Sequence, residues 1–135
     1  FGWKKKELEA VLQKIHNVQM SDCSGSAVYE LPEEIDAYPR IPTAVFLSGF
    51  DPLMLGYEKH ENPFLPQRHL RRVFNLQGIV YPCFLYKGNV AGRWKLEKET
   101  LQLQSFEDFD ALQRQQVEKA AKRLLQPARI IWADF

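Results

Sequence analysis

The central part of the chain most constrains the fold, because it predicts three antiparallel strands in succession. Residues 79–86 are apolar on both faces, as in a strand covered on both sides, and residues 87–89 (Lys-Gly-Asn) provide a turn. Residues 90–97 alternate between apolar and polar side chains, and residues 100–105 follow as a third strand. Pro82 favours an edge or a bulge, because it cannot donate to a ladder. Such a sheet can curl into a small barrel.

The second of these strands has two chemically different faces. Strict alternation places Val90 and Trp94 on one face, which we assign to the core, and Arg93 and Lys95 on the other. In the simplest antiparallel register, the glutamines of the third strand lie beside these two cations. A polar, positively charged sheet face can follow a nucleic-acid backbone. An ordinary solvent-exposed face is the alternative interpretation.

Further elements flank the predicted sheet on both sides in the sequence. A capping-box pattern at Asp110 and Gln113 begins a helix with an apolar stripe, and Pro127 ends it. Residues 43–47 form a short apolar strand, and residues 129–132 are compatible with a last one. The chain from residue 43 onward therefore predicts a small sheet closed by a C-terminal helix.

The N-terminal residues predict a different kind of unit. An amphipathic helix over residues 4–15 is indicated by apolar side chains at helical spacing, namely Leu8, Val11, Leu12 and Ile15. Residues 18–20 and 27–31 then read as a hairpin joined by a longer polar loop, residues 21–26. A helix followed by a hairpin is the closing half of a winged helix.

The stretch from residue 32 to residue 42 separates these two units. It holds three prolines and three acidic residues, which interrupt all periodicity, so we place a connector there. We therefore expect residues 1–31 to be the closing half of a winged helix and residues 43–135 to be a small β-barrel-like domain with a C-terminal helix. The predicted fold class is α+β: a partial winged helix, then a small antiparallel barrel-like sheet with a closing helix.

The overall charge does not by itself indicate a polyanionic partner. The formal net charge is +1, so any argument for DNA binding must rest on where the cations cluster. No apolar stretch approaches the roughly 20 residues of a membrane helix, and no signal peptide opens the chain. We therefore expect a cytoplasmic protein without membrane contact. The chain begins at Phe1 and enters a helix almost at once, which suggests a piece of something longer.

The cysteines and histidines do not predict a metal, cofactor or catalytic site. Cys23 and Cys83 lack the spacing of metal ligands and the density of a disulfide framework, so both read as free thiols and the second as core. The three histidines, His16, His60 and His69, are widely separated. Asp51, followed by proline, reads as a helix cap and not as a catalytic carboxylate.

The densest basic run of the chain comprises Arg68, His69, Arg71 and Arg72. It lies on a predicted short helix, residues 67–74, from which these side chains could meet phosphates as counter-charges. Lys59 in the preceding loop would widen the same patch. A solvated helix face is the alternative, because surface cations are common.

Three motifs, taken in order, resemble a known family. They are LSGFDPLMLGY at residues 47–57, RRVF at residues 71–74 and VAGRW at residues 90–94. Their succession resembles the C-terminal part of the YcaQ/AlkZ-like winged-helix family, over most of residues 43–125. The resemblance implies tandem winged helices and a small β-barrel gathered around DNA, in enzymes that excise alkylated or crosslinked bases by cleaving the N-glycosidic bond.

The same resemblance places catalysis outside these residues. The family's catalytic motif is a Gln, any residue, then Gln or Asp, in an N-terminal part that we expect to be missing here. Gln102-Leu103-Gln104 matches its spelling but occupies a predicted strand, so its glutamines read as outward-facing strand residues. We assign no catalytic residue, and whether the parent protein is an active glycosylase stays open.

The sequence thus predicts a DNA-binding C-terminal fragment of a winged-helix DNA glycosylase-like protein, inactive alone. Its expected partners are double-stranded DNA and the missing N-terminal winged-helix domains of the same chain. The residues expected to contact nucleic acid are Lys59, Arg68, His69, Arg71, Arg72, Arg93 and Lys95. Two alternatives remain: a non-catalytic protein-interaction domain, and part of a winged-helix transcription regulator.

Overall fold

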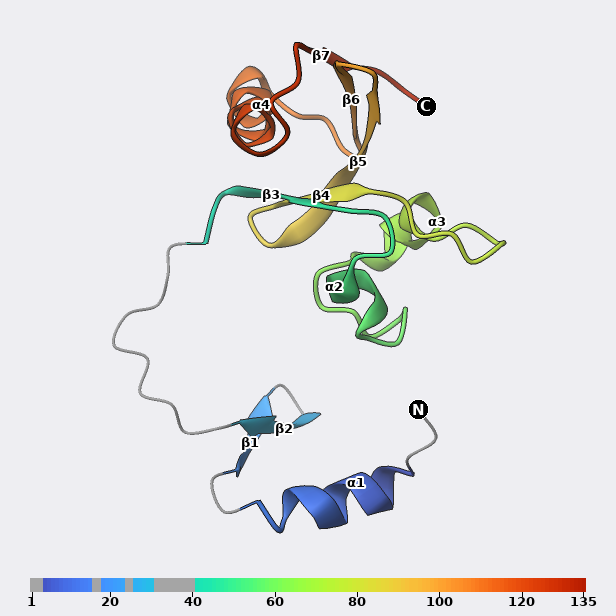
Figure 1. Cartoon of the computed structure of the whole chain (residues 1–135), viewed down its shortest axis with the longest axis vertical. Helices are drawn as coiled ribbons and strands as arrows, with labels where there is room; N and C mark the ends of the chain where they lie inside the picture. The colour runs from blue at the N-terminus through green and yellow to red at the C-terminus, as the bar shows by residue number, and fades with distance from the viewer. Residues whose placement is uncertain (1–3, 16–17, 24–25, 31–40) are drawn as a thin grey trace. The chain divides into compact units, whose positions relative to one another are not determined.

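The computed structural model describes residues 4–15, 18–23, 26–30 and 41–135 (Figure 1). The chain divides into two compact units, Phe1–Arg40 and Ile41–Phe135, and each is described by itself. Most of the expected connector lies outside the described residues, so the domain boundaries predicted from the sequence stay predictions. None of the helices in the described part has the length and hydropathy needed to cross a membrane.

The first unit contains the predicted helix and hairpin. Helix α1 (Lys5–Leu12) begins where the Glu7 carboxylate accepts a hydrogen bond of 3.0 Å from the backbone N–H of Lys4. Strand β1 (Gln19–Cys23) pairs antiparallel with β2 (Ser26–Glu30). The predicted long loop over residues 21–26 is wrong, because the ladder continues to the pair Cys23 and Ser26. Residues 24–25 lie outside the described part of the chain.

The second unit contains a five-stranded sheet. In sheet order its strands are β3 (Ala44–Leu47), β4 (Cys83–Tyr86), β5 (Asn89–Glu97), β6 (Thr100–Ser105) and β7 (Arg129–Trp132). All neighbouring strands are antiparallel except β6 and β7, which are parallel. The predicted succession of three antiparallel strands is confirmed. The predicted barrel-like closure is wrong, because within residues 41–135 no ladder joins β3 to β7 and the sheet is open.

Strand β4 is shorter than predicted, because Pro82 ends the regular ladder. The preceding residues pair elsewhere: Val80 forms an isolated bridge with Phe74, and the N–H of Tyr81 donates to the carbonyl of Val73 at 2.9 Å. The segment before β4 therefore joins the sheet to the helical part of the unit.

A β-bulge interrupts the pairing of β4 with β5. Phe84 pairs with Gly92 while Leu85 pairs with Val90, so Ala91 is an extra residue on β5. The bulge reverses the alternation at the start of β5. The expectation that Val90 shares the face of Trp94 is therefore wrong, although Trp94 itself packs against the core as predicted.

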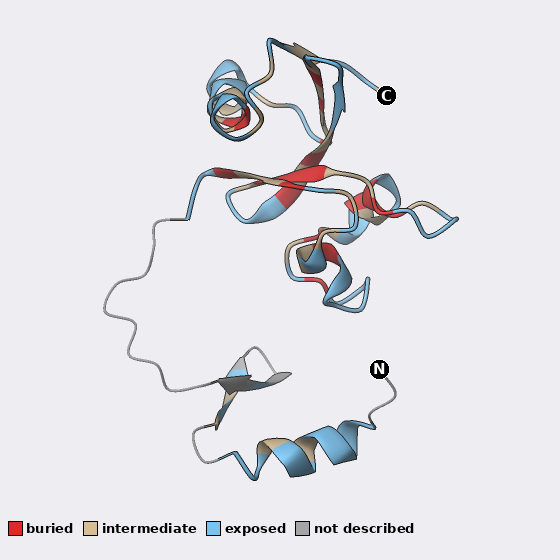
Figure 2. Cartoon of the chain, in the orientation of Figure 1, coloured by how far each residue is buried: buried red, intermediate tan, exposed pale blue. Residues whose placement is uncertain are grey.

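Each face of the sheet carries its own hydrophobic cluster. The first cluster comprises Leu47, Met54, Leu65, Val73, Phe74, Val80, Cys83, Leu85, Val90 and Phe106. The second comprises Ala44, Phe84, Leu101, Leu103, Val117 and Ala121. Figure 2 shows these buried residues along the centre of the sheet and on the faces of the helices turned toward it. Strands β3 and β4 are therefore covered on both sides.

Short helical segments supply the cover of the first cluster. Helix α2 (Pro52–Leu55) begins at Asp51, whose carboxylate accepts a hydrogen bond of 3.0 Å from the N–H of Leu53. The predicted capping role of Asp51 is confirmed. The predicted short helix at residues 67–74 consists of a 3₁₀ turn (Gln67–His69) followed by α3 (Leu70–Val73).

Helix α4 (Ala111–Leu125) covers the second cluster through Val117 and Ala121. Its capping box is formed as predicted: the N–H of Gln113 donates to the Asp110 carboxylate at 2.8 Å, and the N–H of Asp110 donates to the Gln113 side chain at 2.9 Å. The helix ends at Gln126, which adopts the left-handed conformation. The buried Val117 and Ala121 set which face of α4 is turned outward.

Gly92→Ala should strongly destabilise the second unit. A Cβ at this position would lie 2.2 Å from the ring of Phe84 and 2.3 Å from the carbonyl oxygen of Gln104. Because one of these atoms is backbone, we expect the free energy of unfolding to fall by about 3 kcal/mol in chemical denaturation.

Gly78→Ala is the matched control for Gly92→Ala. Gly78 has φ +85 and open space around the added Cβ, so it tests backbone strain alone, about 1–2 kcal/mol. If Gly92→Ala were no more destabilising than Gly78→Ala, the close packing of Phe84 over β5 would not be a constraint on the fold.

Candidate nucleic-acid interface

The basic run at residues 68–72 does not form a single exposed face. Arg68, Arg71 and Arg72 are exposed, whereas His69 is 5% exposed and lies against the ring of Phe106, with a centroid separation of 5.0 Å. The 3₁₀ turn gives way to α3 between His69 and Leu70, which alters the angle between successive side chains. The four side chains of the run therefore do not share one face.

Arg68 is paired with an acidic residue that is distant in the sequence. Its guanidinium forms an ion pair with the Glu107 carboxylate, and its Nε donates to Glu107 Oε1 at 3.0 Å. The hydrogen bond from Arg68 holds the pKa of Glu107 below its ordinary value. The charge of Arg68 is therefore compensated within the fold, although both side chains remain exposed.

His69 is held neutral by its surroundings. Burial lowers its pKa below 6.5, and this effect outweighs the hydrogen bond with Glu107, whose Oε1 lies 3.3 Å from His69 Nε2. A neutral, buried imidazole adds no positive charge to a phosphate-binding surface at pH 7.

Arg72 ties α3 to the segment after β6. Its Nη1 donates to the carbonyl of Phe106 at 3.0 Å, and its guanidinium lies 5.0 Å from the centroid of the Phe106 ring. These contacts tie the guanidinium to Phe106, while Arg72 remains exposed. Arg72 therefore has a structural role in addition to any ligand contact.

The cations of β5 are also engaged within the fold. The register predicted from the sequence is confirmed, since Arg93 pairs with Gln104 and Lys95 with Gln102. Arg93 Nε donates to Gln104 Oε1 at 2.7 Å, and Lys95 forms an ion pair with Glu97. This sheet face is polar, as expected, but its positive charge is partly compensated.

The glutamines that match the spelling of a catalytic motif are strand residues. Gln102 Nε2 donates to Glu97 Oε2 at 3.0 Å, and Gln104 Nε2 donates to Asp134 Oδ1 at 3.0 Å. Both lie on β6, which confirms their assignment to a strand.

Arg71 and Lys59 are the most available of the residues predicted from the sequence. Within the described residues no carboxylate is paired with either. Lys59 Nζ lies 5.1 Å from the centroid of the Phe74 ring, and Arg71 lines an open hollow of about 520 Å³ with Phe74 and Leu76. Leu76, which is 86% exposed, stands on the turn between Phe74 and Val80.

Sequence reasoning missed a second group of free cations. Lys119, Lys122 and Arg123 are exposed on α4, and within the described residues none of them is paired with a carboxylate. Their spacing of three and four residues was visible in the sequence. That spacing does not show whether carboxylates elsewhere in the fold pair with these cations.

The described residues contain no group of three or more His, Cys, Asp or Glu side chains arranged to hold a metal ion. Cys83 is fully buried, and burial raises the pKa of its thiol to about 12. A thiol with this pKa stays protonated and unreactive at pH 7. The prediction that Cys83 belongs to the core is confirmed.

Comparison with known proteins defines the class of this chain. A family model described as DNA glycosylase AlkZ-like matches residues 1–126. The chain therefore belongs to the AlkZ-like DNA glycosylase family, as the motifs at residues 47–57, 71–74 and 90–94 indicated. No curated protein matches it significantly.

A solved structure, the Streptomyces sahachiroi DNA glycosylase AlkZ, has a similar fold. The two share 24% sequence identity with a TM-score of 0.76, and the match covers 97% of this chain. It covers 38% of the Streptomyces chain, so the present chain spans well under half of that protein. The mixed α and β architecture, with its mostly antiparallel sheet and C-terminal helix, is consistent with this fold.

Acidification should destabilise the protein through His69. The unfolded chain binds a proton near pH 6.5 that the folded chain, with its lowered His69 pKa, does not bind. The contribution is therefore present above pH 6.5 and is lost as pH falls through the folded-state pKa. The free energy of unfolding should decline with a slope of at most about 1.4 kcal/mol per pH unit.

The measurement is chemical denaturation between pH 7 and pH 5, with His69→Gln as the comparison. That variant keeps His16 and His60, so a shallower pH dependence in the variant reports His69 alone. Glu107, whose pKa is also lowered from 4.5, contributes mainly at the acidic end of this range. Identical pH profiles for the two proteins would contradict a lowered His69 pKa.

Proposed function

We propose that this chain is the DNA-binding part of a DNA glycosylase-related repair protein. In this proposal it holds the duplex while an alkylated or crosslinked base is unstacked and excised by residues elsewhere in a longer protein. The observation that carries the proposal is the AlkZ-like family match over residues 1–126. The match covers 38% of the Streptomyces glycosylase, and in our proposal the residues that excise the base belong to a longer protein.

The proposal also assigns a winged-helix origin to the first unit. Helix α1 followed by the β1–β2 hairpin has the element order of the closing half of a winged helix. Its completing helices would belong to N-terminal domains of the same protein, which we propose as intramolecular partners. The second unit then supplies the sheet and C-terminal helix beside the DNA.

Within the second unit, Arg71 is the strongest candidate for a phosphate contact among the residues predicted from the sequence. It is exposed and unpaired, and Lys59 is the next most available. In our proposal Arg68, His69 and Arg72 position this surface, because their charges or rings are engaged with Glu107 and Phe106. Arg93 and Lys95 remain secondary candidates on the sheet face.

A second candidate function is favoured by the surface of α1. Within the described residues two of its apolar side chains are open to solvent, with exposed fractions of 49% for Leu8 and 43% for Val11. An amphipathic helix with its apolar stripe uncovered is typical of a docking element. A role as a protein-interaction module, toward the rest of its own protein, is compatible with DNA binding by the second unit.

Removing Arg71 should weaken DNA binding, and removing Arg68 should not. Arg71→Gln should reduce the slope of log Kobs against log salt concentration by about 1, the value for one lost phosphate contact. Arg68→Gln removes the same formal charge from the same helical segment, but from a guanidinium already neutralised by Glu107. The measurement is salt-dependent binding to duplex DNA by fluorescence anisotropy.

Two outcomes of this comparison would count against the proposal. If the unmodified chain did not bind duplex DNA at low salt, the proposed DNA-binding function would be wrong. Equal effects of Arg71→Gln and Arg68→Gln would show that net charge matters and that Arg71 has no specific contact.

A further inference from the structure

The geometry points to a second phosphate-contacting surface on the outer face of α4, formed by Lys119, Lys122 and Arg123. This inference rests on the proposed DNA-binding function and names a site for it that the basic run at residues 68–72 does not include. We call these three side chains the α4 cation stripe.

Helical geometry brings the three cations of the stripe together. Residues three and four apart are neighbours on a helix surface, and a rise of about 1.5 Å per residue separates Lys119 from Arg123 by about 6 Å along the axis. The opposite face of α4 is fixed against the sheet by Val117 and Ala121, which are fully buried. The stripe therefore cannot rotate into the core and is presented outward.

The acidic residue nearest to the stripe in sequence is engaged with another partner. Glu118 Oε1 accepts a hydrogen bond of 2.8 Å from Trp132 Nε1, which holds its carboxylate toward β7. Arg114 also turns toward this side, with its guanidinium 5.3 Å from the centroid of the Trp132 ring. Glu118 keeps its negative charge and lines the same hollow as Lys119 and Lys122, but within the described residues no ion pair joins it to either.

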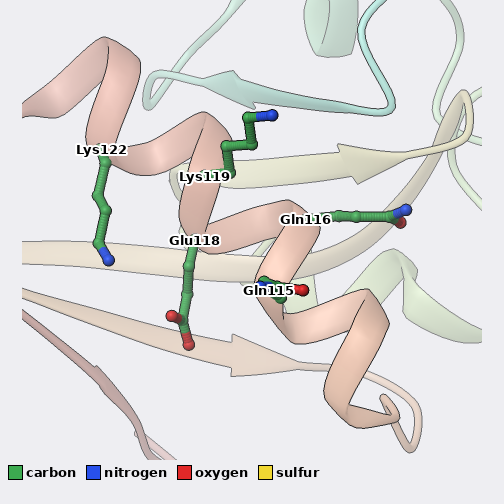
Figure 3. A pocket seen from close by; sticks show the side chains of 5 residues that line it. All are labelled: Gln115, Gln116, Glu118, Lys119 and Lys122. Atoms are coloured by element: carbon green, nitrogen blue, oxygen red, sulfur yellow. The ribbon is translucent and has the colours of Figure 1, made fainter.

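Two glutamines extend the stripe with neutral donors. Gln116 Oε1 accepts a hydrogen bond of 2.6 Å from the Tyr86 hydroxyl, which leaves the Gln116 amide N–H groups free to donate. Gln115 is exposed beside it, and both line an open hollow of about 450 Å³ with Glu118, Lys119 and Lys122. Figure 3 shows Lys119 and Lys122 extending from α4 in different directions, with Glu118 on the side of Lys122. Amide and ammonium donors suit the oxygens of a phosphodiester backbone.

A neighbouring groove offers a different occupant for the same cations. Lys119 and Arg123 also border an apolar groove of about 640 Å³ between α4 and β3, lined by Val45, Ala120 and Leu124. An acidic protein segment could fill such a groove. We favour DNA because Lys122 and Gln115 extend the polar surface beyond the groove and around the helix, where an apolar segment would gain nothing.

The ordinary role of cations near a helix C-terminus does not account for the whole stripe. Lys122 and Arg123 lie in the last turn, where they interact favourably with the helix dipole. Lys119 lies one turn earlier, and the dipole effect falls off within the last turn. A dipole role affects helix stability, whereas a phosphate contact affects DNA affinity and its dependence on salt.

The test is the triple variant Lys119→Gln, Lys122→Gln and Arg123→Gln in the complete 135-residue chain. Glutamine keeps a helix propensity close to that of lysine and arginine, so α4 should stay folded, which thermal melting followed by circular dichroism verifies. Three lost phosphate contacts should lower the slope of log Kobs against log salt concentration by roughly 3 and weaken binding to duplex DNA at low salt at least about tenfold.

The matched control removes the same charge from other exposed positions, through Lys14→Gln, Lys98→Asn and Arg129→Gln. It should leave the slope nearly unchanged, since these side chains lie on other elements. If the unmodified chain binds DNA and the two triple variants behave alike, the α4 cation stripe is not a DNA contact. If the unmodified chain does not bind DNA at all, both the proposed function and the α4 cation stripe as a DNA contact are overturned.

Discussion

The packing of the Phe84 ring over Gly92 is the constraint on which the rest of the second unit depends. Because β5 has no side chain at this point, Phe84 enters the core, where it contacts the rings of Phe46, Phe109 and Trp132. The adjacent bulge sends Val90 to the opposite face, so that both faces of the central strands are covered. The orientation of α4, and with it the α4 cation stripe, follows from this packing.

The same fold divides the cations into those that hold the structure and those that are free. Arg68 and Arg72 connect the helical segment to Glu107 and Phe106, and through them to the chain that leads into α4. These contacts give both arginines a structural role within the fold. Arg71, Lys59 and the α4 cation stripe are among the exposed cations of residues 41–135 that no carboxylate pairs with. A formal net charge of +1 is therefore compatible with local DNA contacts.

Local patterns in the sequence predicted most of the elements, and long-range contacts account for what they missed. Alternation, capping boxes and turns located the strands, the caps at Asp51 and Asp110, and α4, because each depends on neighbouring residues. The face of Val90 could not be predicted, since the bulge arises from pairing with β4. The ion pair of Arg68 could not be predicted either, because Glu107 is 39 residues away in the sequence. The three cations of the stripe were visible at helical spacing but carried no signal of being unpaired.

The most direct test of this account is a nuclear magnetic resonance titration of the isotopically labelled chain with a short DNA duplex at low salt. The account predicts that amide signals shift along the C-terminal half of α4 and around Arg71, and that the shifts disappear as salt concentration rises. Signals at the Arg68–Glu107 pair should change little. Shifts confined to the apolar groove between α4 and β3, or no shifts anywhere in residues 41–135, would contradict it.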